Sequence, residues 1–474
     1  MSESCELVVI GGGPAGLAAA TTAAELGVMV TLIDEQSTPG GQIFRSIENS
    51  GGANSTILGQ DDSHGRALVD AFRKSDAVYR ALSDVWVVTA ERSVGVVSSD
   101  AASMVKAQRI IIATGSMERS IPFPGWTLPG VMTVGAGQIL LKQEGIVPDG
   151  VAQVGDTNTG IVLAGVGPLL LLVACQYLRA GVAIQALLDM TPRVNYLHAL
   201  PHLPMALAAG DYISKGNALK RELAQAGIQI VTGVSNIAAH GNSHIGSVEY
   251  IVSGQRHTLQ TDLLLVHFGV VPNGHLATSL GVKEVWDEGQ QCWRPLIDSW
   301  GNTDIKGVAL AGDCAGISGA WSAELSGRLV AIQSACSLGH IDRKERDRLA
   351  VCERRAMKQD LRVRPFLEAL FRLSAPLRGQ FSDDTLICRC EEVTAGRVRE
   401  AVAVGCQGPN QVKAYTRAGM GPCQGRQCAS SVAYVVAAAL GVKVETVGQF
   451  RVRSPIKPIT LGMLALLDLD EVDA

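Results

Sequence analysis

The chain has 474 residues, which is too long for one ordinary domain, so two to four domains are expected. Apolar residues make up 47% of the chain and charged residues 18%, which is typical of a globular protein with large buried cores. The 41 basic and 45 acidic residues leave a net charge of -4, which gives no electrostatic basis for binding nucleic acid or an anionic membrane.

The start of the chain and its cysteines indicate an intracellular protein. A strand-like run at Cys5–Ile10 begins almost at once and leaves no room for a signal peptide. The most apolar stretch, Gly167–Cys175, is far shorter than the ~20 residues that span a bilayer. We therefore expect a cytoplasmic protein, with a peripheral position at the inner face of the membrane as the alternative. The eleven cysteines are expected to be reduced.

The first third of the chain follows the order strand, glycine-rich turn, helix, strand. The first strand is followed by an alanine-rich helix that ends at Gly27, and a second strand covers Val28–Asp34. A third apolar strand comes much later, at Arg109–Gly115. This order predicts an α/β domain of the Rossmann-like, dinucleotide-binding type.

The run "GGGPAG" at residues 11–16 separates the first strand from the first helix. Its first glycine permits a tight turn, the second lets the backbone approach a pyrophosphate, and the third lets the helix pack closely on the strand. The pyrophosphate then lies at the helix N-terminus, and a carboxylate about 20 residues further on holds the ribose hydroxyls. A glycine turn in an empty fold is the alternative. The predicted cofactor-binding residues are Gly11, Gly13, Pro14, Ala15, Gly16, Asp34 and Glu35.

The middle of the chain repeats this pattern with an altered turn. A strand and turn at Gly160–Pro168 precede a helix, and the next strand covers Val182–Asp189. Leu170 stands where the third glycine belongs, so its side chain would push the helix from the strand or narrow the space for a pyrophosphate. Asp189 ends the next strand and is the candidate ribose ligand of this impaired site. Three alternatives stay open: an NAD(P)H site, a pocket that is occluded or holds another nucleotide, and a vestigial fold.

Three further stretches make residues 1–340 resemble the flavoproteins with two dinucleotide-binding domains, of the pyridine nucleotide-disulfide oxidoreductase type. They are "PGGQI" at 39–43, "IIIATGS" at 110–116 and "ALAGDCAG" at 309–316. In that family the Gly-Asp pair of the third stretch closes on the ribityl and pyrophosphate part of FAD; a helix N-cap is the structural alternative for its aspartate. The resemblance implies FAD, with further cofactor-binding residues at Gly41, Gln42, Thr114, Gly115, Gly312 and Asp313.

Four cysteines near the C-terminus have the spacing Cys388-x-Cys390, then 32 residues, then Cys423-x4-Cys428. Four thiolates that converge from two loops bind zinc or an iron–sulfur cluster. Gaps of one and four residues are atypical of structural zinc sites. Cys406 lies outside this pattern and is expected to be a packing residue, as is Cys175 in the middle of the chain.

The sequences around these cysteines, "ICRCEEVTAGRVREAV" and "VKAYTRAGMGPCQGRQC", resemble the bacterioferritin-associated-ferredoxin-like [2Fe-2S] domain. The resemblance implies a [2Fe-2S] cluster held by the four thiolates; zinc and an unliganded remnant stay open. Thr394 is expected to cap one helix, and Asn410 to cap a shorter one that Gly419 ends. A third helix starts beside Cys428, and helix N-termini near the sulfurs would stabilise the charge of the cluster.

These features divide the chain into four parts. A charge-dense run at Arg343–Arg364 predicts a solvated linker helix, with partner docking as the alternative. The expected boundaries are 1–118 and 262–340 for the FAD-binding domain, 119–261 for the second, degenerate dinucleotide-binding domain, 341–381 for the helical linker, and 382–474 for the small, mainly helical [2Fe-2S] domain and tail.

The whole chain also resembles one narrower group. The stretch at Glu118–Gln138, the altered second turn, the cysteine-containing domain and the tail "FRVRSPIKPITLGMLA" carry this resemblance. The group is the α subunit of hetero-oligomeric amino-acid and opine dehydrogenases: D-hydroxyproline and dye-linked proline dehydrogenases, octopine and nopaline dehydrogenases, and the hydrogen cyanide synthase B subunit.

This resemblance implies that the substrate amine is oxidised at an FAD on a D-amino-acid-oxidase-like β subunit, and that the present chain passes the electrons to an external acceptor, a quinone or the respiratory chain. A small ferredoxin-like γ subunit, and FMN or another nucleotide at a subunit interface, are left open. Two other functions are alternatives: a self-contained NAD(P)H-dependent reductase and a non-enzymatic redox-sensing scaffold. No catalytic residue is assigned, and His267 is expected to be a core residue. The basic tail from Phe450 is either a surface segment or a strap over the cluster domain or a partner.

Overall fold

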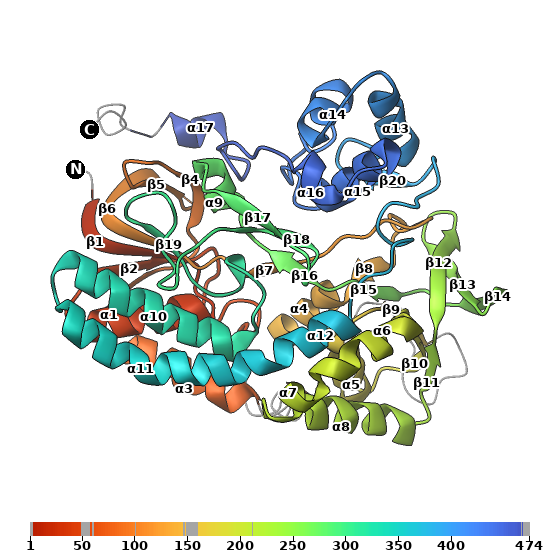
Figure 1. The fold of residues 1–474 in the computed structure, drawn as a ribbon, viewed down its shortest axis with the longest axis horizontal. Coiled ribbons are helices and arrows are strands. Elements are labelled where there is room, and N and C mark those ends of the chain that lie inside the picture. The colour runs from red at the N-terminus through yellow and green to blue at the C-terminus, as the bar shows by residue number, and fades with distance from the viewer. Residues whose placement is uncertain are drawn as a thin grey trace.

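The computed structural model describes residues 3–48, 57–58, 61–99, 101–145, 147, 160–210, 212–465 and 467. Figure 1 shows a sheet-based domain on the left, a second sheet-based domain at the lower right, and a helical module in blue at the upper right. No helix within the described residues is long and apolar enough to cross a membrane.

The first domain is built on a mixed sheet with the strand order β3-β2-β1-β6-β5-β4, to which β19 adds by pairing with β6. The strands β3, β2, β1, β6 and β19 run parallel, whereas β4 and β5 are antiparallel additions. Its elements are β1 (Glu3–Ile10), α1 (Pro14–Glu25), β2 (Val30–Ile33), α3 (Asp61–Lys74), β3 (Val78–Arg80), β4 (Asp84–Val88), β5 (Ser93–Val97), β6 (Ala102–Ile112), β19 (Val308–Leu310), η2 (Gly312–Cys314) and α10 (Ala320–Leu338).

Both faces of this sheet are buried, as the alternation along β1 shows. Leu7 and Val9 belong to one core, which the helices α1 and α10 cover. Val8 and Ile10 point to the opposite face, because successive residues of a strand alternate, and they join a second core. The helix α10 lies tightly on α1: a Cβ at Gly327 would come within 2.1 Å of a backbone oxygen of α1. The first domain is therefore a layered α/β unit with the glycine-rich turn at the carboxyl edge of its sheet.

The second domain has a parallel sheet with the order β11-β10-β9-β15-β8 and a separate antiparallel sheet β12-β13-β14. Short paired strands, β7 with β16 and β17 with β18, lie where the two domains meet. The elements between β6 and β19, which form the second domain and its junction with the first, are β7 (Ser116–Glu118), β8 (Val131–Thr133), α4 (Val134–Glu144), β9 (Ile161–Gly165), α5 (Pro168–Arg179), β10 (Ile184–Asp189), α6 (Arg193–Ala199), η1 (Leu200–His202), α7 (Leu203–Leu207), α8 (Tyr212–Gln225), β11 (Gln229–Thr232), β12 (Val234–Gly241), β13 (Ile245–Val252), β14 (Gln255–Gln260), β15 (Leu264–His267), β16 (Val270–Pro272), α9 (His275–Leu280), β17 (Glu284–Asp287) and β18 (Cys292–Pro295). Of these, α9 packs in the core of the first sheet.

The charge-dense linker forms two helices rather than one. The helix α11 (Arg343–Asp360) starts at Asp342, whose side chain accepts a hydrogen bond from the N–H of Glu345. A 3₁₀ turn, η3 (Leu361–Val363), separates it from α12 (Arg364–Leu370), which has a proline in its first turn. Proline cannot continue a preceding α-helix, so α11 ends before it. Few residues of α11 are buried within the chain, which fits a solvated helix and equally a surface for a partner.

The C-terminal helical module contains a short hairpin and four helices among the residues described. Thr394 accepts a hydrogen bond from the N–H of Arg397, so its predicted capping role is confirmed. The prediction for Asn410 was wrong: Gly408 is the N-cap of that helix, Thr416 is its last residue, and Asn410 bonds to the tail instead. The elements are β20 (Leu386–Cys388), β21 (Val393–Thr394), α13 (Ala395–Ala403), α14 (Pro409–Thr416), α15 (Ala429–Leu440) and α16 (Val444–Val447), with α17 (Leu461–Leu464) in the tail.

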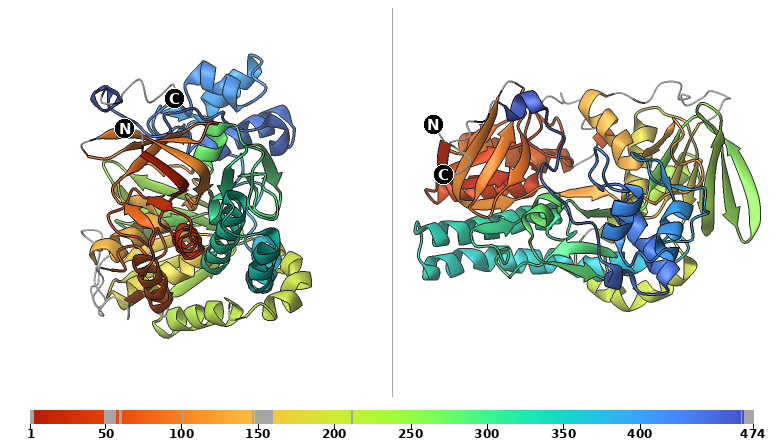
Figure 2. Two further views of the ribbon diagram at one scale, coloured as in Figure 1. Left: turned by 90° about the vertical axis from the view of Figure 1, so that its left-hand side faces the viewer. Right: turned by 90° about the horizontal axis from the view of Figure 1, so that it is seen from above.

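The C-terminal module is docked on the second domain. The indole of Trp126 donates a hydrogen bond to the carbonyl of Leu386, and Ser431 donates to the carbonyl of Ser120. One continuous apolar core joins the sheets of the second domain to the helices of the module. Figure 2 shows the tail leaving the module and crossing to the first domain, so the C-terminal region contacts both dinucleotide-type domains.

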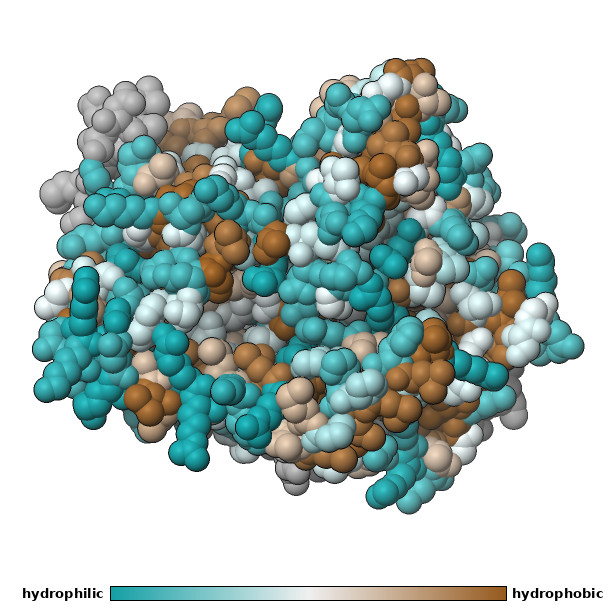
Figure 3. All heavy atoms as spheres, viewed as in Figure 1, coloured by the Kyte–Doolittle hydropathy of each residue, from teal (hydrophilic) through white to brown (hydrophobic). Residues whose placement is uncertain are grey.

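Large apolar side chains are exposed along α6, η1 and α7. Figure 3 shows brown side chains gathered at the lower right of the molecule, where these elements lie. Exposed apolar patches of this kind mark contact surfaces on many proteins. The exposed residues are Val194, Tyr196, Leu197, Leu200, Met205 and Leu207.

Candidate cofactor sites

The glycine-rich turn between β1 and α1 has the geometry of a phosphate cradle. Gly11 has a φ of +108°, and a Cβ there would lie 2.5 Å from the carbonyl oxygen of Ala113. A Cβ at Gly16 would lie 1.8 Å from the oxygen of Gly11, so only glycine allows the helix to start this close to the turn. No side chain caps the N-terminus of α1, and Pro14 occupies its first turn. The free N–H groups therefore remain available to an anion.

Asp34 lies directly after β2 and is bound to the turn. Its buried carboxylate accepts hydrogen bonds from the N–H groups of Gly12 and, at 2.7 Å, Gln36. Burial raises the pKa of Asp34 above its ordinary value, although both N–H groups oppose that shift. At the next residue, Glu35, burial would also raise the pKa, but the hydrogen bond and charge of Lys457 lower it. Two carboxylates thus stand where a ribose is held in dinucleotide-binding folds.

The loop that contains Gly41 and Gln42 packs directly on the glycine-rich turn. Gly41 has a φ of +61°, and a Cβ there would lie 2.6 Å from the Cα of Gly13. The side chain of Gln42 accepts a hydrogen bond of 3.1 Å from Arg45. Lys142, from α4, donates to the carbonyl of Ile43 at 2.8 Å and so connects this loop to the second domain.

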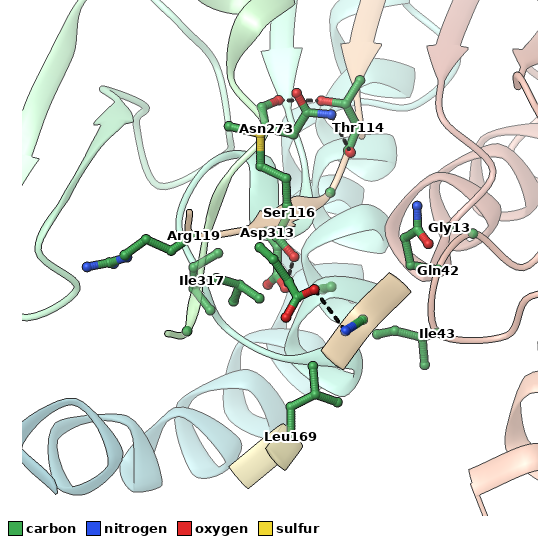
Figure 4. Close-up of a pocket in the computed structure, with 18 of the residues that line it drawn as sticks. Gly13, Gln42, Ile43, Thr114, Ser116, Arg119, Leu169, Asn273, Asp313 and Ile317 are labelled. Carbon is green, nitrogen blue, oxygen red and sulfur yellow. Dashed lines mark hydrogen bonds between the residues drawn. The ribbon is translucent and has the colours of Figure 1, made fainter. Parts of the chain in front are cut away.

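On the opposite side of the pocket, the turn at Thr114–Gly115 is held by Asn273. The hydroxyl of Thr114 donates to the carbonyl of Asn273 at 2.7 Å, and the N–H of Asn273 donates to the carbonyl of Gly115 at 2.9 Å. Figure 4 shows this pair at the top of the pocket, with Gly13, Gln42 and Ile43 on the right. The turn is therefore fixed by a residue 159 positions away in the chain.

Asp313 organises the entry to α10 while it faces the pocket. Its Oδ1 accepts hydrogen bonds from the N–H and hydroxyl of Ser318 at 2.8 and 3.1 Å and from the N–H of Gly319 at 3.1 Å. Its Oδ2 lies 3.5 Å from the hydroxyl of Ser116, as Figure 4 shows. A Cβ at the preceding Gly312 would lie 2.7 Å from the Cβ of Ala15. Capping and cofactor contact are compatible at this residue, since Oδ2 is not used by the helix entry.

These residues surround a cavity of about 850 Å³, a size that accommodates a nucleotide cofactor. Its wall also includes residues that the sequence motifs did not reveal: Gln36, Ser116 and Asn273 from the first domain, and Arg426 and Lys457 from the C-terminal region. Of the residues predicted from the sequence, those that line the cavity are Gly11, Gly13, Pro14, Ala15, Asp34, Glu35, Gly41, Gln42, Thr114, Gly115 and Asp313.

The cavity extends to the second glycine turn, which differs from the first. Leu170 is buried in the core behind that turn, so its side chain does not enter the cavity. The ring of His267 lies beside Gly167: a Cβ on this glycine would be 3.2 Å from Cδ2 of the imidazole. His267 is buried, as predicted, and its Nδ1 is 2.7 Å from Glu118, which also accepts from the N–H of Gly135 at 2.8 Å. His267 also lines the cavity, which its place in the sequence did not indicate.

The four cysteines of the C-terminal module lie near one another. Cys428 shifts the pKa of Cys388, Cys423 shifts that of Cys390, and all three of the other thiols shift that of Cys428. The arms approach so closely that a Cβ at Gly421 would lie 2.3 Å from the Cβ of Cys390. Among the described residues, no three His, Cys, Asp or Glu side chains are gathered around one point suited to a single metal ion.

Backbone amides are directed at the sulfurs. The neighbouring thiol of Cys428 lowers the pKa of Cys388 to about 6. The N–H groups of Gly419, Glu391 and Cys390 also lower this pKa, whereas burial raises it. Cys428 is also the N-cap of α15, as predicted, so its sulfur lies at the start of a helix. The environment favours the thiolate at Cys388, whereas the thiol of Cys388 together with burial raises the pKa of Cys428, and burial raises that of Cys390. Cys175 is buried in the core of the second domain, as expected, and Cys406 packs partly against the core of the module.

Comparisons with known proteins agree with this geometry. Residues 5–336 match the family model described as pyridine nucleotide-disulphide oxidoreductase, and residues 382–466 match the sarcosine oxidase A3 domain. The A subunit of opine oxidase from Agrobacterium tumefaciens is 38% identical over 98% of this chain and 92% of its own length. The HcnB subunit of hydrogen cyanide synthase from Pseudomonas protegens is 32% identical over 95% of this chain and 96% of its own length.

Among solved structures, L-proline dehydrogenase from P. horikoshii has the same fold, with a TM-score of 0.70 and 21% identity over 98% of this chain and 80% of that one. The family match covers most of the chain, including the glycine-rich turn, the loop at Gly41 and the Asp313 turn. The chain therefore belongs to the pyridine nucleotide-disulphide oxidoreductase family and is an FAD-dependent oxidoreductase.

Proposed function

We propose that this chain is the electron-transfer subunit of a hetero-oligomeric amino-acid or opine dehydrogenase, with FAD in the first dinucleotide pocket and a [2Fe-2S] cluster on Cys388, Cys390, Cys423 and Cys428. A D-amino-acid-oxidase-like β subunit oxidises the substrate amine, and a quinone or the respiratory chain accepts the electrons. The similar opine oxidase and hydrogen cyanide synthase chains are themselves named as subunits, which supports a complex with other chains.

One observation carries this proposal: the loop between Cys423 and Cys428 forms part of the wall of the dinucleotide cavity. Arg426, within this loop, lines the cavity. His275, at the start of α9 and close in sequence to Asn273, lies near this loop, since its pKa is shifted by burial, by the charge of Arg426 and by the backbone of Gln424. The cysteine loop and the cofactor pocket are therefore neighbours in one folded unit, which supports electron transfer between the two cofactors.

The residues of the first pocket fit FAD. The N-terminus of α1 offers free N–H groups to a pyrophosphate, and Asp34 and Glu35 offer carboxylates to a ribose. Asp313 leaves one carboxylate oxygen facing the cavity, where it can accept from a sugar-like hydroxyl. Gln42 and Thr114 stand on two sides of the remaining space. Bound FAD takes up electrons in pairs, and an iron–sulfur cluster passes them on one at a time.

The spacing of the four thiols favours a binuclear cluster over a single zinc ion, because gaps of one and four residues are atypical of structural zinc sites. A [2Fe-2S] cluster takes two thiolates at each iron, and each arm of the pattern supplies two thiols that interact with those of the other arm. A structural zinc ion takes four ligands around one point. The N–H groups directed at Cys388 would also stabilise the negative charge of an iron–sulfur cluster, because hydrogen bonds to the sulfurs set its potential.

The test is to purify the chain anaerobically in complex with its β subunit, and to measure FAD, iron and acid-labile sulfide in the band of this chain. Cys428→Ser is expected to lose iron and sulfide and to stop substrate-driven dye reduction, while FAD stays bound. Cys406→Ser is the matched control, since this cysteine lies in the same module outside the pattern of four cysteines. It is expected to keep both cofactors and the activity.

Tightly held zinc without sulfide, or full electron transfer in the Cys428→Ser complex, would contradict the cluster assignment. Strong substrate oxidation by this chain alone would contradict the division of labour between subunits. A second candidate function, an NAD(P)H-dependent reductase, is favoured by the extension of the cavity to the second glycine turn. It predicts rapid bleaching of the bound flavin by NADH or NADPH in stopped flow, which our proposal does not.

A further inference from the structure

The segment 449–457, here called the strap, is attached at one end to the cysteine-containing module. The ring of Phe450 packs against the loop that contains Cys423. A Cβ at Gly419 would lie 2.6 Å from this ring, and a Cβ at Gly425 would lie 2.9 Å from it. The side chain of Asn410 accepts from the N–H of Arg451 at 2.8 Å and donates to the carbonyl of Gln449 at 3.0 Å. The strap therefore starts as an integral part of the module.

The other end of the strap belongs to the first domain. Val452 and Ile456 are buried in the core on the face of the sheet opposite α1. The N–H of Ile456 donates to the carbonyl of Trp86 at 3.0 Å, and Lys457 is bonded to both Glu35 and Asp84. In Figures 1 and 2 the chain runs on from here to α17, which lies beside β4 and β5.

Arg426 joins the strap to the cysteine loop at the edge of the cavity. Its guanidinium donates to the carbonyl of Ile456 at 3.0 Å and to the carbonyl of Cys423 at 3.3 Å. Both Arg426 and Lys457 line the dinucleotide cavity. They enter it on the side of Glu35, which is the side where the ribose next to the adenine is held in this fold.

We infer that Lys457 and Arg426 are cofactor-site residues: they complete the adenosine end of the FAD pocket, and through them cofactor binding and the seating of the cysteine loop depend on each other. The identity of the cofactor rests on the proposed function. The N-terminal motifs alone do not complete the pocket, because two of the cations in its wall come from residues more than 400 positions after the glycine-rich turn.

The charges around Lys457 explain its part in this site. Glu35 and Asp84 are both bonded to its ammonium group, and Asp34 adjoins Glu35. Burial would lower the pKa of Lys457, but the hydrogen bonds to Asp84 and Glu35 raise it, so the group stays charged. Without it, these carboxylates would face a cofactor that itself carries two negative phosphates, and like charges in a partly buried site repel strongly.

The same contacts link the two halves of the molecule. A dinucleotide that contacts Lys457 and Arg426 stabilises the docked strap, and the docked strap holds the loop between Cys423 and Cys428 against the cavity. The coupling free energy between FAD binding and seating of the loop acts equally in both directions. A correctly seated cysteine loop must therefore tighten FAD binding by the factor by which FAD stabilises the loop.

The experiment compares Lys457→Met with Lys457→Arg and with Lys443→Met, which removes a largely exposed lysine of the same module that forms an ion pair with Glu445. FAD affinity of the full chain is measured by flavin fluorescence. Lys457→Met is expected to weaken FAD binding about tenfold, because it leaves charged hydrogen-bonding groups unpaired in the wall. Lys457→Arg is expected to restore most of the affinity, and Lys443→Met to stay within about twofold of the original chain.

Hydrogen exchange tests the linkage without any measurement of activity. FAD is expected to slow amide exchange in segments 419–428 and 450–457 of the original chain, and not in Lys457→Met. Equal FAD affinity in the original chain and Lys457→Met, or equal FAD-induced protection, overturns the inference. So does a loss of melting temperature in Lys457→Met that is as large without FAD as with it, since that pattern shows a purely structural role. A chain that binds no FAD refutes the proposed function, and this assignment with it; a chain that binds FAD but not iron refutes only the cluster.

Discussion

The contact between Gly41 and Gly13 gives a sharp test of the cofactor pocket. In Gly41→Ala, the new residue must adopt a φ of +61°, and its Cβ would lie 2.6 Å from the Cα of Gly13 and 3.2 Å from its nitrogen. Left-handed backbone costs a residue with a Cβ about 1–2 kcal/mol. The clash with backbone on both sides of the contact adds about 1–3 kcal/mol, as overpacking does in other tightly packed sites. The expected loss of stability is the sum, about 2–5 kcal/mol.

Gly339→Ala separates the two terms. Gly339 ends α10 with a φ of +89°, and a Cβ there would meet nothing within 4 Å, so only the backbone cost of about 1–2 kcal/mol applies. The assay is thermal melting of the FAD-free chain, where 1 kcal/mol corresponds to about 2–4 °C for a domain of this size. Gly41→Ala is expected to lower the melting temperature about twice as far, and to reduce FAD retention on gel filtration. Equal losses in the two variants would refute the close approach of the loop to the glycine-rich turn.

Three further outcomes follow from the structure. Burial and the charge of Arg426 lower the pKa of His275 to about 4. As the pH falls from 6.5 towards 4, the unfolded chain therefore binds more protons than the folded chain, and the melting temperature should fall. The fall should be smaller in His275→Gln. Gly327→Ala should strongly lower the free energy of unfolding, because the new Cβ would lie 2.1 Å from the oxygen of Ala15. Gly216→Ala, in open space within α8, should instead raise the free energy of unfolding by about 1 kcal/mol. Urea unfolding measures both. Tyr177→Phe should leave the melting temperature unchanged or raise it, because its buried hydroxyl has no hydrogen-bond partner among the described residues; a clear drop would reveal a partner.

The parts of the fold that local sequence predicts are those whose cause is local. The strand at Cys5–Ile10, the glycine-rich turn, the Thr394 cap and the helix that starts at Cys428 each depend on neighbours within a few residues. Their apolar period, side-chain oxygen or missing Cβ can be recognised without the rest of the chain. Asn410 shows where this reasoning fails: it has the side chain of a good N-cap, but the strap offers it a donor and an acceptor that its own helix does not.

The parts of the site that sequence did not predict depend on contacts between distant residues. Asn273 holds the turn at Thr114, and Lys457 reaches Glu35 across 422 positions. Neither asparagine nor lysine in those places carries a motif, because its role exists only once the sheet and the module are assembled. The one available signal for Lys457 was the basic, proline-containing tail, which left a surface segment and a strap equally open.

The two glycine turns of this chain show why one of them is the better dinucleotide site. At the first turn, a Cβ on Gly13 would meet only the Cα of Gly41, at 3.9 Å, so the backbone remains open to a ligand. At the second turn, a Cβ on the equivalent Gly167 would lie 3.2 Å from the ring of His267, which is bonded to Glu118. The second turn therefore shares its side of the cavity with an imidazole, and a pyrophosphate bound there would have to fit beside that ring.

The two turns also differ at the third glycine position, which is Gly16 in the first turn and Leu170 in the second. A Cβ at Gly16 would overlap the oxygen of Gly11, so the first helix needs a glycine at this position, whereas the second helix carries Leu170 there with its side chain buried in the core behind the turn. The first turn therefore keeps all three glycines that bring helix N–H groups to a pyrophosphate, and the second turn lacks one of them. Both differences weaken the second site for NAD(P)H, and they support a partner protein, rather than a nicotinamide cofactor, as the source of the electrons that reach this chain.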